Sequence, residues 1–198
     1  GINIVVNEVY AAERTENITS SSASFTETGA NGTNFDNPSG VTDGEDAKLT
    51  GTITESNISN PISITAKGGN GGKDDGSFGG SPTVMQGATG GDAIAKVTVD
   101  ESLSSVTTGN ITVNATGGIN GSAYQGLGGA AGAAAAYGLE VKHDLTITAA
   151  AIDVKAQTEY KYNSYGTEVA IDVDKHSDAT ATGLQVDGGT VGFTGTTI

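Results

Sequence analysis

A short phrase recurs along this chain at irregular intervals. Residues 136–141 read Ala-Tyr-Gly-Leu-Glu-Val, and residues 181–186 read Ala-Thr-Gly-Leu-Gln-Val. Related phrases occur at 164–169, as Ser-Tyr-Gly-Thr-Glu-Val, and more loosely at 92–97, as Asp-Ala-Ile-Ala-Lys-Val. A repeated unit this small cannot bury its own apolar face and has to stack on copies of itself. The sequence therefore predicts a repeat architecture rather than a compact globule.

A second phrase alternates between apolar and polar residues. It occurs at 62–66, 111–115, 145–149 and 191–195, where the order is apolar, polar, apolar, polar, small. This period of two is typical of a short β-strand with one buried face. Four short strands are therefore expected at these positions.

The two phrases combine near the end of the chain. Residues 138–149 match residues 183–195 once one residue is inserted between the strands, so two strands and a tight connection recur as one unit. The interval of 17 residues between Ser164 and Ala181 is close to one turn of a parallel β-helix, whereas longer intervals require loops or additional turns. No segment has a helical period over a useful length. We therefore expect an all-β fold, a parallel β-helix (β-solenoid) with irregular coils.

The composition agrees with a thin core. Of the 198 residues, 35% are hydrophobic, 31 are glycine and none is tryptophan. A β-solenoid buries only narrow columns of aliphatic and small side chains between sheets about 10 Å apart. The low aromatic content is what this geometry requires.

The chain divides by how clearly it repeats. Residues 1–46 repeat poorly, and we interpret them as an N-terminal strand with degenerate first coils, a cap or a decorated loop region. Residues 47–198 form the expected β-solenoid region, with glycine-rich excursions at 68–91 and 117–132. Both excursions follow the same strand phrase, so they should project from one flank. They are either flexible loops or a binding or packing surface.

The charge balance argues against several partners. With 23 acidic residues against 9 basic ones, and Arg14 as the only arginine, the net charge of −14 leaves few groups to grip the phosphates of nucleic acid. No run of 18 apolar residues exists, so no membrane-spanning segment is expected. The chain has no cysteine, and His143 and His176 lie outside any catalytic motif, so we expect no enzyme. Because it starts with Gly1 rather than Met, we expect a mature product or an excised fragment.

Three groups of acidic residues are candidates for calcium, the one cofactor that the sequence leaves open. Asp172, Asp174 and Asp178 have oxygen-rich spacing, but they lack the glycine and the final glutamate of an EF-hand loop. The other two groups are the acidic residues within 43–46 and the aspartate pair at 74–75. A solvated acidic face is the alternative interpretation of each group.

Three tyrosines form a candidate partner-binding surface. Tyr160 and Tyr162 share one face of an expected strand, and Tyr165 is close by. Such rings stack on sugars and anchor protein interfaces. Packing across neighbouring strands is the alternative.

The phrases at 136–141 and 181–191 resemble the repeats of bacterial type V autotransporter passengers and related filamentous adhesins. The likeness covers about residues 47 to 198. It implies a right-handed parallel β-helix, export through the outer membrane, and adhesion at the extracellular cell surface to host or neighbouring cells. Absence of cysteine agrees with such export. The resemblance assigns no functional residue in this chain.

These observations predict a non-enzymatic, exported adhesin segment that displays loops and a tyrosine-bearing face to a host or bacterial surface protein or glycan. The alternative is a subunit of an extracellular filament or surface layer. Its self-association would pair the hydrophobic strand at 1–9 with the sheet edge of a neighbour. A glycan-degrading β-helix enzyme is the third class, and the single arginine counts against it.

Overall fold

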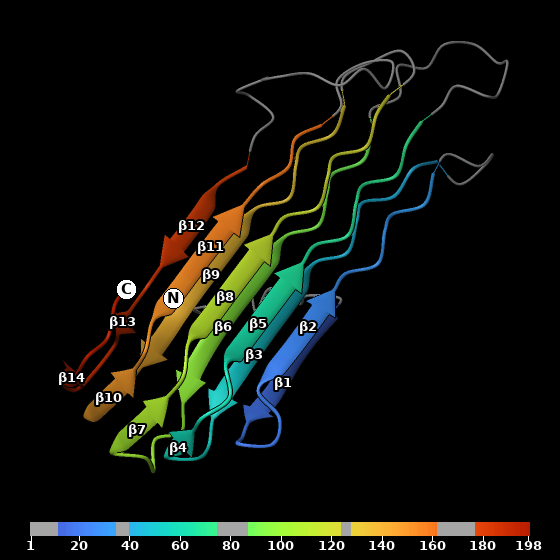
Figure 1. Ribbon diagram of the computed structural model, residues 1–198. Helices are drawn as coiled ribbons and strands as arrows, with labels where there is room; N and C mark the ends of the chain where they lie inside the picture. Colours follow the sequence, from blue (N-terminus) through green and yellow to red (C-terminus); the bar gives the residue numbers. More distant parts are fainter. Residues whose placement is uncertain (1–11, 35–39, 75–86, 124–127, 162–176) are drawn as a thin grey trace, which may run out of the picture.

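Every regular element in the described part of the chain is a β-strand. The computed structural model describes residues 12–34, 40–74, 87–123, 128–161 and 177–198. Its named strands pair only in parallel and lie in three sheets (Figure 1). The all-β prediction is therefore confirmed, and the parallel pairing is consistent with a β-solenoid.

Sheet 1 takes strands from regions far apart in the sequence. Its strand order is β1-β3-β6-β9-β12, and β13 also pairs with β9. The strands are β1 Ala12–Ile18, β3 Ala47–Ile53, β6 Ala93–Val99, β9 Ala134–Val141, β12 Ala179–Thr182 and β13 Gln185–Val186.

Sheets 2 and 3 hold the strands that follow those of sheet 1 along the chain. Sheet 2 has the order β14-β10-β7-β4 and sheet 3 the order β11-β8-β5-β2. The strands of sheet 2 are β4 Asn57–Ile58, β7 Ser105–Thr108, β10 Leu145–Ala149 and β14 Val191–Phe193. Those of sheet 3 are β2 Ser24–Thr28, β5 Ile62–Lys67, β8 Ile111–Thr116 and β11 Ile152–Gln157.

From β3 onward the chain visits sheets 1, 2 and 3 in turn and then returns to sheet 1, whereas β1 is followed by β2 of sheet 3. We call one such circuit, including the first, a repeat. Ala12, Ala47, Ala93, Ala134 and Ala179 are successive register partners in sheet 1, at intervals of 35, 46, 41 and 45 residues. The predicted turn of 17 residues is therefore too short for these circuits, because the first holds two strands and a long connection and each of the next three holds three strands and a long connection. The repeats are numbered 1 to 5 and span 12–46, 47–92, 93–133, 134–178 and 179–198.

The first recurring phrase predicts strand register correctly at one place. Residues 181–186 pair with 136–141 as expected, and the next strands are offset by one further residue, since Leu145 pairs with Val191. The looser phrase at 92–97 is misaligned by three residues, because Ala95 rather than Asp92 pairs with Ala136. The phrase at 164–169 lies outside the described residues.

The second recurring phrase belongs to two different sheets. Ile62 and Ile111 begin strands of sheet 3, whereas Leu145 and Val191 begin strands of sheet 2. The fourth-repeat partner of Ile111 is Ile152. Both sheets bury one face, so the same alternation arises in each and does not reveal which sheet a strand joins.

The inward side chains form ladders of matching residues. In sheet 3, for example, Ile64 pairs with Val113 and Val113 with Val154. Ladders this regular bury aliphatic side chains in repeats 1 to 4, as the thin core requires. The largest fully buried side chains are Ile18, Leu49, Ile53, Ile58, Ile62, Ile64, Val97, Val106, Ile111, Val113, Leu139 and Ile147.

In repeat 1 the inward ladders end in charged side chains. Arg14 is the register partner of the buried Leu49, and Glu27 is the partner of the buried Ala66. The guanidinium of Arg14 pairs with Glu16 at 2.5 Å and with Glu27 at 3.4 Å. Although its sequence repeats poorly, this part of the chain joins sheets 1 and 3 and places ion pairs where repeat 2 has Leu49 and Ala66.

The glycine-rich excursions connect sheet 3 back to sheet 1 in repeats 1 to 4. Figure 1 shows their described parts as wavy segments that run side by side beyond the arrowheads of sheet 3. We call these segments together the glycine arm. Its outbound legs are 29–34, 68–74, 117–123 and 158–161, and its inbound legs are 40–46, 87–92, 128–133 and 177–178.

The legs of the glycine arm bond with a period of three residues. The N–H groups of Gly68, Gly71 and Asp74 donate to carbonyl oxygens of the next repeat at 2.8–2.9 Å, the first at the end of β8 and the other two in the outbound leg. Those of Gly69 and Gly72 donate to the inbound leg of the preceding repeat at 2.8 and 3.0 Å. Three residues per turn is the period of polyproline II rather than of a β-strand.

Glycine is required where the legs approach each other most closely. A Cβ atom on Gly68 would lie 1.8 Å from the carbonyl oxygen of Gly91, and one on Gly117 would lie 1.8 Å from that of Gly132. No side chain fits such a gap. Both excursions therefore lie on the same flank, as predicted, and their described parts are packed backbone rather than flexible loops.

Candidate functional site

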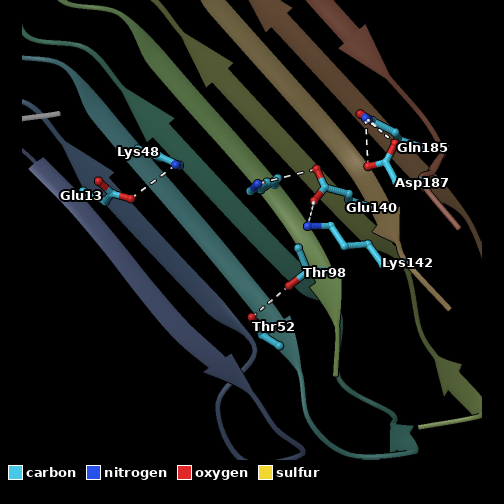
Figure 2. A network of polar contacts seen from close by, with 9 residues as sticks. Glu13, Lys48, Thr52, Thr98, Glu140, Lys142, Gln185 and Asp187 are labelled. Atoms are coloured by element: carbon cyan, nitrogen blue, oxygen red, sulfur yellow. Dashed lines mark hydrogen bonds and ion pairs between the residues drawn. The ribbon is translucent and has the colours of Figure 1, made fainter. Parts of the chain in front are cut away.

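Sheet 1 presents polar side chains on its outer face. Along each strand, the residues between the inward ones point away from the core. Asn17, Thr52, Thr98, Glu140 and Gln185 are aligned in register, one on each successive repeat. The hydroxyl oxygens of Thr52 and Thr98 are 2.9 Å apart (Figure 2). A polar ligand lying across the strands would meet a group of this row about every 4.8 Å.

Glu140 lies between two lysines on this face (Figure 2). Its Oε2 atom is 3.6 Å from Nζ of Lys96, and its Oε1 atom is 3.7 Å from Nζ of Lys142. The Glu140 side chain is only 12% exposed, whereas that of Lys142 is 60% exposed. The two ammonium groups therefore hold an enclosed carboxylate from both sides.

A β-bulge separates Glu140 from the preceding outward residue of its strand. Between the pairs Lys96–Tyr137 and Thr98–Glu140, β9 has two residues where β6 has one. The additional residue turns inward, because Leu139 is fully buried. Bulges re-aim side chains and are common beside binding sites. Here the bulge keeps both Tyr137 and Glu140 on the outer face.

A hollow of about 190 Å³ opens beside Glu140. It is smaller than the roughly 300–1,000 Å³ pockets that take drug-sized ligands. Its polar groups are hydroxyl, carboxylate and ammonium. The hollow is lined by Thr98, Val99, Glu101, Glu140 and Lys142.

Tyr137 adds a half-buried aromatic ring to the same face. It stands in register with Lys96 on one side and with Thr182 on the other. Neither Tyr137 nor Glu140 is among the site residues predicted from the sequence, although both belong to the recurring phrase at 136–141. The glycine and leucine between them were the available signal, because two successive inward residues mark a bulge.

The turn after β6 fixes the residues at the edge of the hollow. The carboxylate of Asp100 accepts hydrogen bonds from Ser102, at 2.6 Å from the hydroxyl and 2.9 Å from the main-chain N–H. These bonds, and the nearby His143, lower the pKa of Asp100 below its ordinary value of 3.8. Nε2 of His143 donates to the carbonyl of Leu103 at 2.7 Å, and its Nδ1 is buried without a partner. The neighbouring Glu101 is thereby positioned against the hollow.

The predicted tyrosine surface is described only in part. Tyr160 is half-buried and follows the end of β11, outside any strand. Tyr162 and Tyr165 lie outside the described residues. The structure therefore brings none of the three tyrosines to the outer face of sheet 1 within the described ranges.

The predicted calcium group is likewise described at one residue. Asp178 is exposed just before β12, and its main-chain carbonyl accepts the N–H of Ala134 at 3.0 Å. Asp172 and Asp174 lie outside the described residues. Within the described ranges, no group of three or more histidine, aspartate or glutamate side chains is arranged to hold a metal ion.

The acidic residues at 43–46 serve the stacking of repeats. Oδ1 of Asp43 accepts the N–H of Thr89 at 2.8 Å, and Oδ1 of Asp46 accepts the N–H of Asp92 at 2.7 Å. The donor lies one repeat further along the chain in both cases. These side chains therefore replace a missing main-chain acceptor between neighbouring inbound legs.

Asparagines do the same for the outbound legs. Oδ1 of Asn31 accepts the N–H of Asn70, and Oδ1 of Asn70 accepts that of Ile119, at 2.9 and 3.0 Å. Oδ1 of Asn34 accepts the N–H of Lys73 at 2.9 Å. Together with the main-chain bonds, these contacts give every N–H group of the leg at 68–74 an acceptor.

No protein-family model, curated protein sequence or solved structure matches this chain. Among the described residues, no helix has the length and apolar character needed to cross a membrane.

Proposed function

We propose that this chain is a right-handed parallel β-helix that serves as a non-enzymatic adhesin segment of an exported, cell-surface protein. The three parallel sheets, visited in a fixed order, support the solenoid part of this proposal. The resemblance to autotransporter passengers supports the extracellular location. A rigid stack of this kind presents side chains on a fixed lattice, which suits attachment to a partner surface.

The observation that carries the proposal is the outer face of sheet 1. Its side chains are polar in register across all five repeats at the row from Asn17 to Gln185. The hollow beside Glu140 and the ring of Tyr137 give this face local shape. Polar rows with one aromatic anchor and one depression are features of recognition surfaces.

The direct test is attachment of the purified, fluorescently labelled chain to cells. The proposal predicts saturable binding to epithelial or bacterial cells, competed by unlabelled chain and abolished by prior heat denaturation. Turnover of a glycan substrate by the same preparation would contradict the non-enzymatic assignment. Absence of saturable binding to every cell type in the panel would contradict the adhesin assignment.

A second candidate, the filament subunit, is favoured by the end of the stack at repeat 5. Val186 and Ile198, at 41% and 62% exposure, are the large hydrophobic residues that the described part of the chain leaves exposed, and both lie there. The strand β12 also ends sheet 1. Such an edge accepts a neighbour's strand.

Light scattering and negative-stain microscopy separate the two candidates. A filament subunit forms fibres, and deletion of residues 1–10 abolishes them if the N-terminal strand is the one exchanged. An adhesin segment stays monomeric and folded with or without these residues. Added calcium should leave either result unchanged if the acidic residues act only between repeats.

A further inference from the structure

We infer that the hollow beside Glu140 binds one ring of a neutral glycan and that Tyr137 stacks on a neighbouring ring. This inference rests on the proposed adhesin function and names its ligand class. It uses the outer face of β6 and β9, where the bulge keeps the two side chains on the same side of sheet 1.

The size and groups of the hollow fit a single sugar ring. Its volume of about 190 Å³ accepts one small polar ring rather than a peptide or a larger cofactor. Carboxylates at Glu101 and Glu140 can accept hydrogen bonds from sugar hydroxyls, and the ammonium of Lys142 and the hydroxyl of Thr98 can donate hydrogen bonds to hydroxyl oxygens. Adjacent hydroxyls on a sugar present this same mixture of donors and acceptors.

The ion pairs leave hydrogen-bonding capacity for a ligand. The distances from Glu140 to Lys96 and Lys142, 3.6 and 3.7 Å, exceed the normal hydrogen-bond range of about 2.7–3.2 Å. Charge attraction thus holds the Glu140 carboxylate near the two ammonium groups, and at these distances each group can still form a shorter hydrogen bond to a ligand. A sugar hydroxyl between carboxylate and ammonium would make charge-assisted hydrogen bonds to both.

The charges favour a neutral glycan over an acidic one. Two glutamates and one lysine line the hollow, and a second lysine, Lys96, pairs with Glu140, so these four charges balance. The whole chain carries −14, and this charge repels anionic polymers over about 8 Å at physiological ionic strength. Uronic and sialic acids are therefore disfavoured, and neutral hexoses are not.

The position of Tyr137 sets the length of the ligand. Its register partner Lys96 precedes Thr98 by two residues, which places the ring roughly 7 Å along the strand from the hollow. A glycan of at least two rings is needed to reach both. Aromatic rings stack on the apolar face of a sugar, and the half-buried Tyr137 offers such a face.

Binding of soluble gluco-, galacto- and manno-oligosaccharides, with a polyuronate as the acidic probe, tests the inference by saturation-transfer NMR and calorimetry. At least one neutral oligosaccharide should bind, and the polyuronate should not. Tyr137→Ala and Lys142→Gln should each weaken binding about tenfold, whereas Tyr137→Phe should bind like the unchanged chain. Lys142 is mostly exposed, so its replacement tests the site even if other variants fold poorly.

The matched control is a second glutamate–lysine pair on the same face. Oε1 of Glu13 lies 3.3 Å from Nζ of Lys48 near the other end of sheet 1 (Figure 2), and neither residue lines the hollow. Glu13→Gln should leave glycan binding unchanged, whereas Glu140→Gln should weaken it. Equal binding by all variants, or binding of the polyuronate, overturns the inference while cell attachment persists. If the unchanged chain does not attach to cells, the proposed function is overturned instead.

Discussion

Aspartate and asparagine side chains act at the residue scale as acceptors between repeats. The bond from the N–H of Asp92 to Oδ1 of Asp46 is 2.7 Å long, and Asp92 in turn accepts the N–H of Ala133 at the same distance. Outside the glycine arm, Oδ1 of Asp144 accepts the N–H of Thr190 at 2.8 Å. In each bond the side chain belongs to one repeat and the donor to the next. Asp43, Asp46, Asp92 and Asp144 therefore have a structural use between repeats.

Replacing Asp46 tests this role. Asp46→Ala removes the acceptor and leaves the N–H of Asp92 without its partner, so we expect a loss of about 1 kcal/mol in the free energy of unfolding. Asp46→Asn keeps an oxygen in place and should cost less than half as much. The midpoint of urea unfolding measures both variants. Equal losses would mean that the charge, and not the hydrogen bond, is what matters.

Asp100 offers a residue-scale test of pH dependence. Its pKa is lowered chiefly by the hydrogen bond from the Ser102 hydroxyl, so the charged form is favoured in the folded state. This carboxylate therefore stabilises the fold above its unfolded pKa and loses that contribution as the pH falls through the lower folded pKa. Ser102→Ala should raise the pKa of Asp100 towards 3.8, as followed by NMR of the carboxyl carbon. The replacement His143→Gln should raise it less.

At the scale of elements, the glycine arm differs from the strands that it extends. Strand residues alternate with a period of two, whereas the N–H groups of the arm change partner with a period of three. The legs pack through backbone rather than through side chains, so each close approach depends on one glycine.

Replacing two different glycines by alanine tests whether the arm depends on close packing of its backbone. Gly68→Ala places a methyl group 1.8 Å from a main-chain oxygen and should cost more than about 2 kcal/mol, or prevent folding. Gly192→Ala in β14 meets no atom within 4 Å and should be neutral or slightly stabilising. Thermal unfolding followed by circular dichroism compares the two. Similar melting temperatures would show that the arm does not pack as described.

The sequence predicted strands well and their connections poorly. Alternation located β5, β8 and β10, and the recurring phrase aligned repeat 5 on repeat 4, because burial on one face leaves a direct imprint on residue order. The three-residue period of the legs could not be predicted from the sequence, because their many glycines carry no side chain that would mark an inward position. The site was missed for a related reason, since Glu140 owes its position to a bulge that only the register with Thr98 reveals.

For the whole molecule, repeat 1 differs from the repeats that follow. Arg14, Glu16 and Glu27 occupy inward positions whose register partners in repeat 2 are Leu49, Gly51 and Ala66. Among the described strands, β1 lies at the edge of sheet 1, and inward-pointing charges on an edge strand oppose pairing with another chain. The Arg14 guanidinium also lies over the ring of Phe25, 5.7 Å from its centre, and Phe25 packs against the core.

Removing these charges should promote self-association. The triple variant Arg14→Leu, Glu16→Val, Glu27→Ala extends the apolar ladders to this end of the stack, so we expect higher molar mass by light scattering than for the unchanged chain. Glu13→Gln, which alters an outward residue of the same strand, is the control and should not change the mass. A triple variant of unchanged mass would show that the charges do not limit association.

The glycine arm also has a thermodynamic consequence. Burial of apolar side chains gives unfolding its large positive heat capacity change, whereas burial of peptide groups contributes with the opposite sign. The core ladders are of the first kind, and the legs, which bury glycine backbone, are mostly of the second. On cooling, the hydrophobic contribution to the ladders weakens, but the hydrogen bonds of the legs do not weaken with it. The strands with their core ladders and the legs of the glycine arm therefore reach their greatest stability at different temperatures. The temperature of greatest stability is lower for the glycine arm.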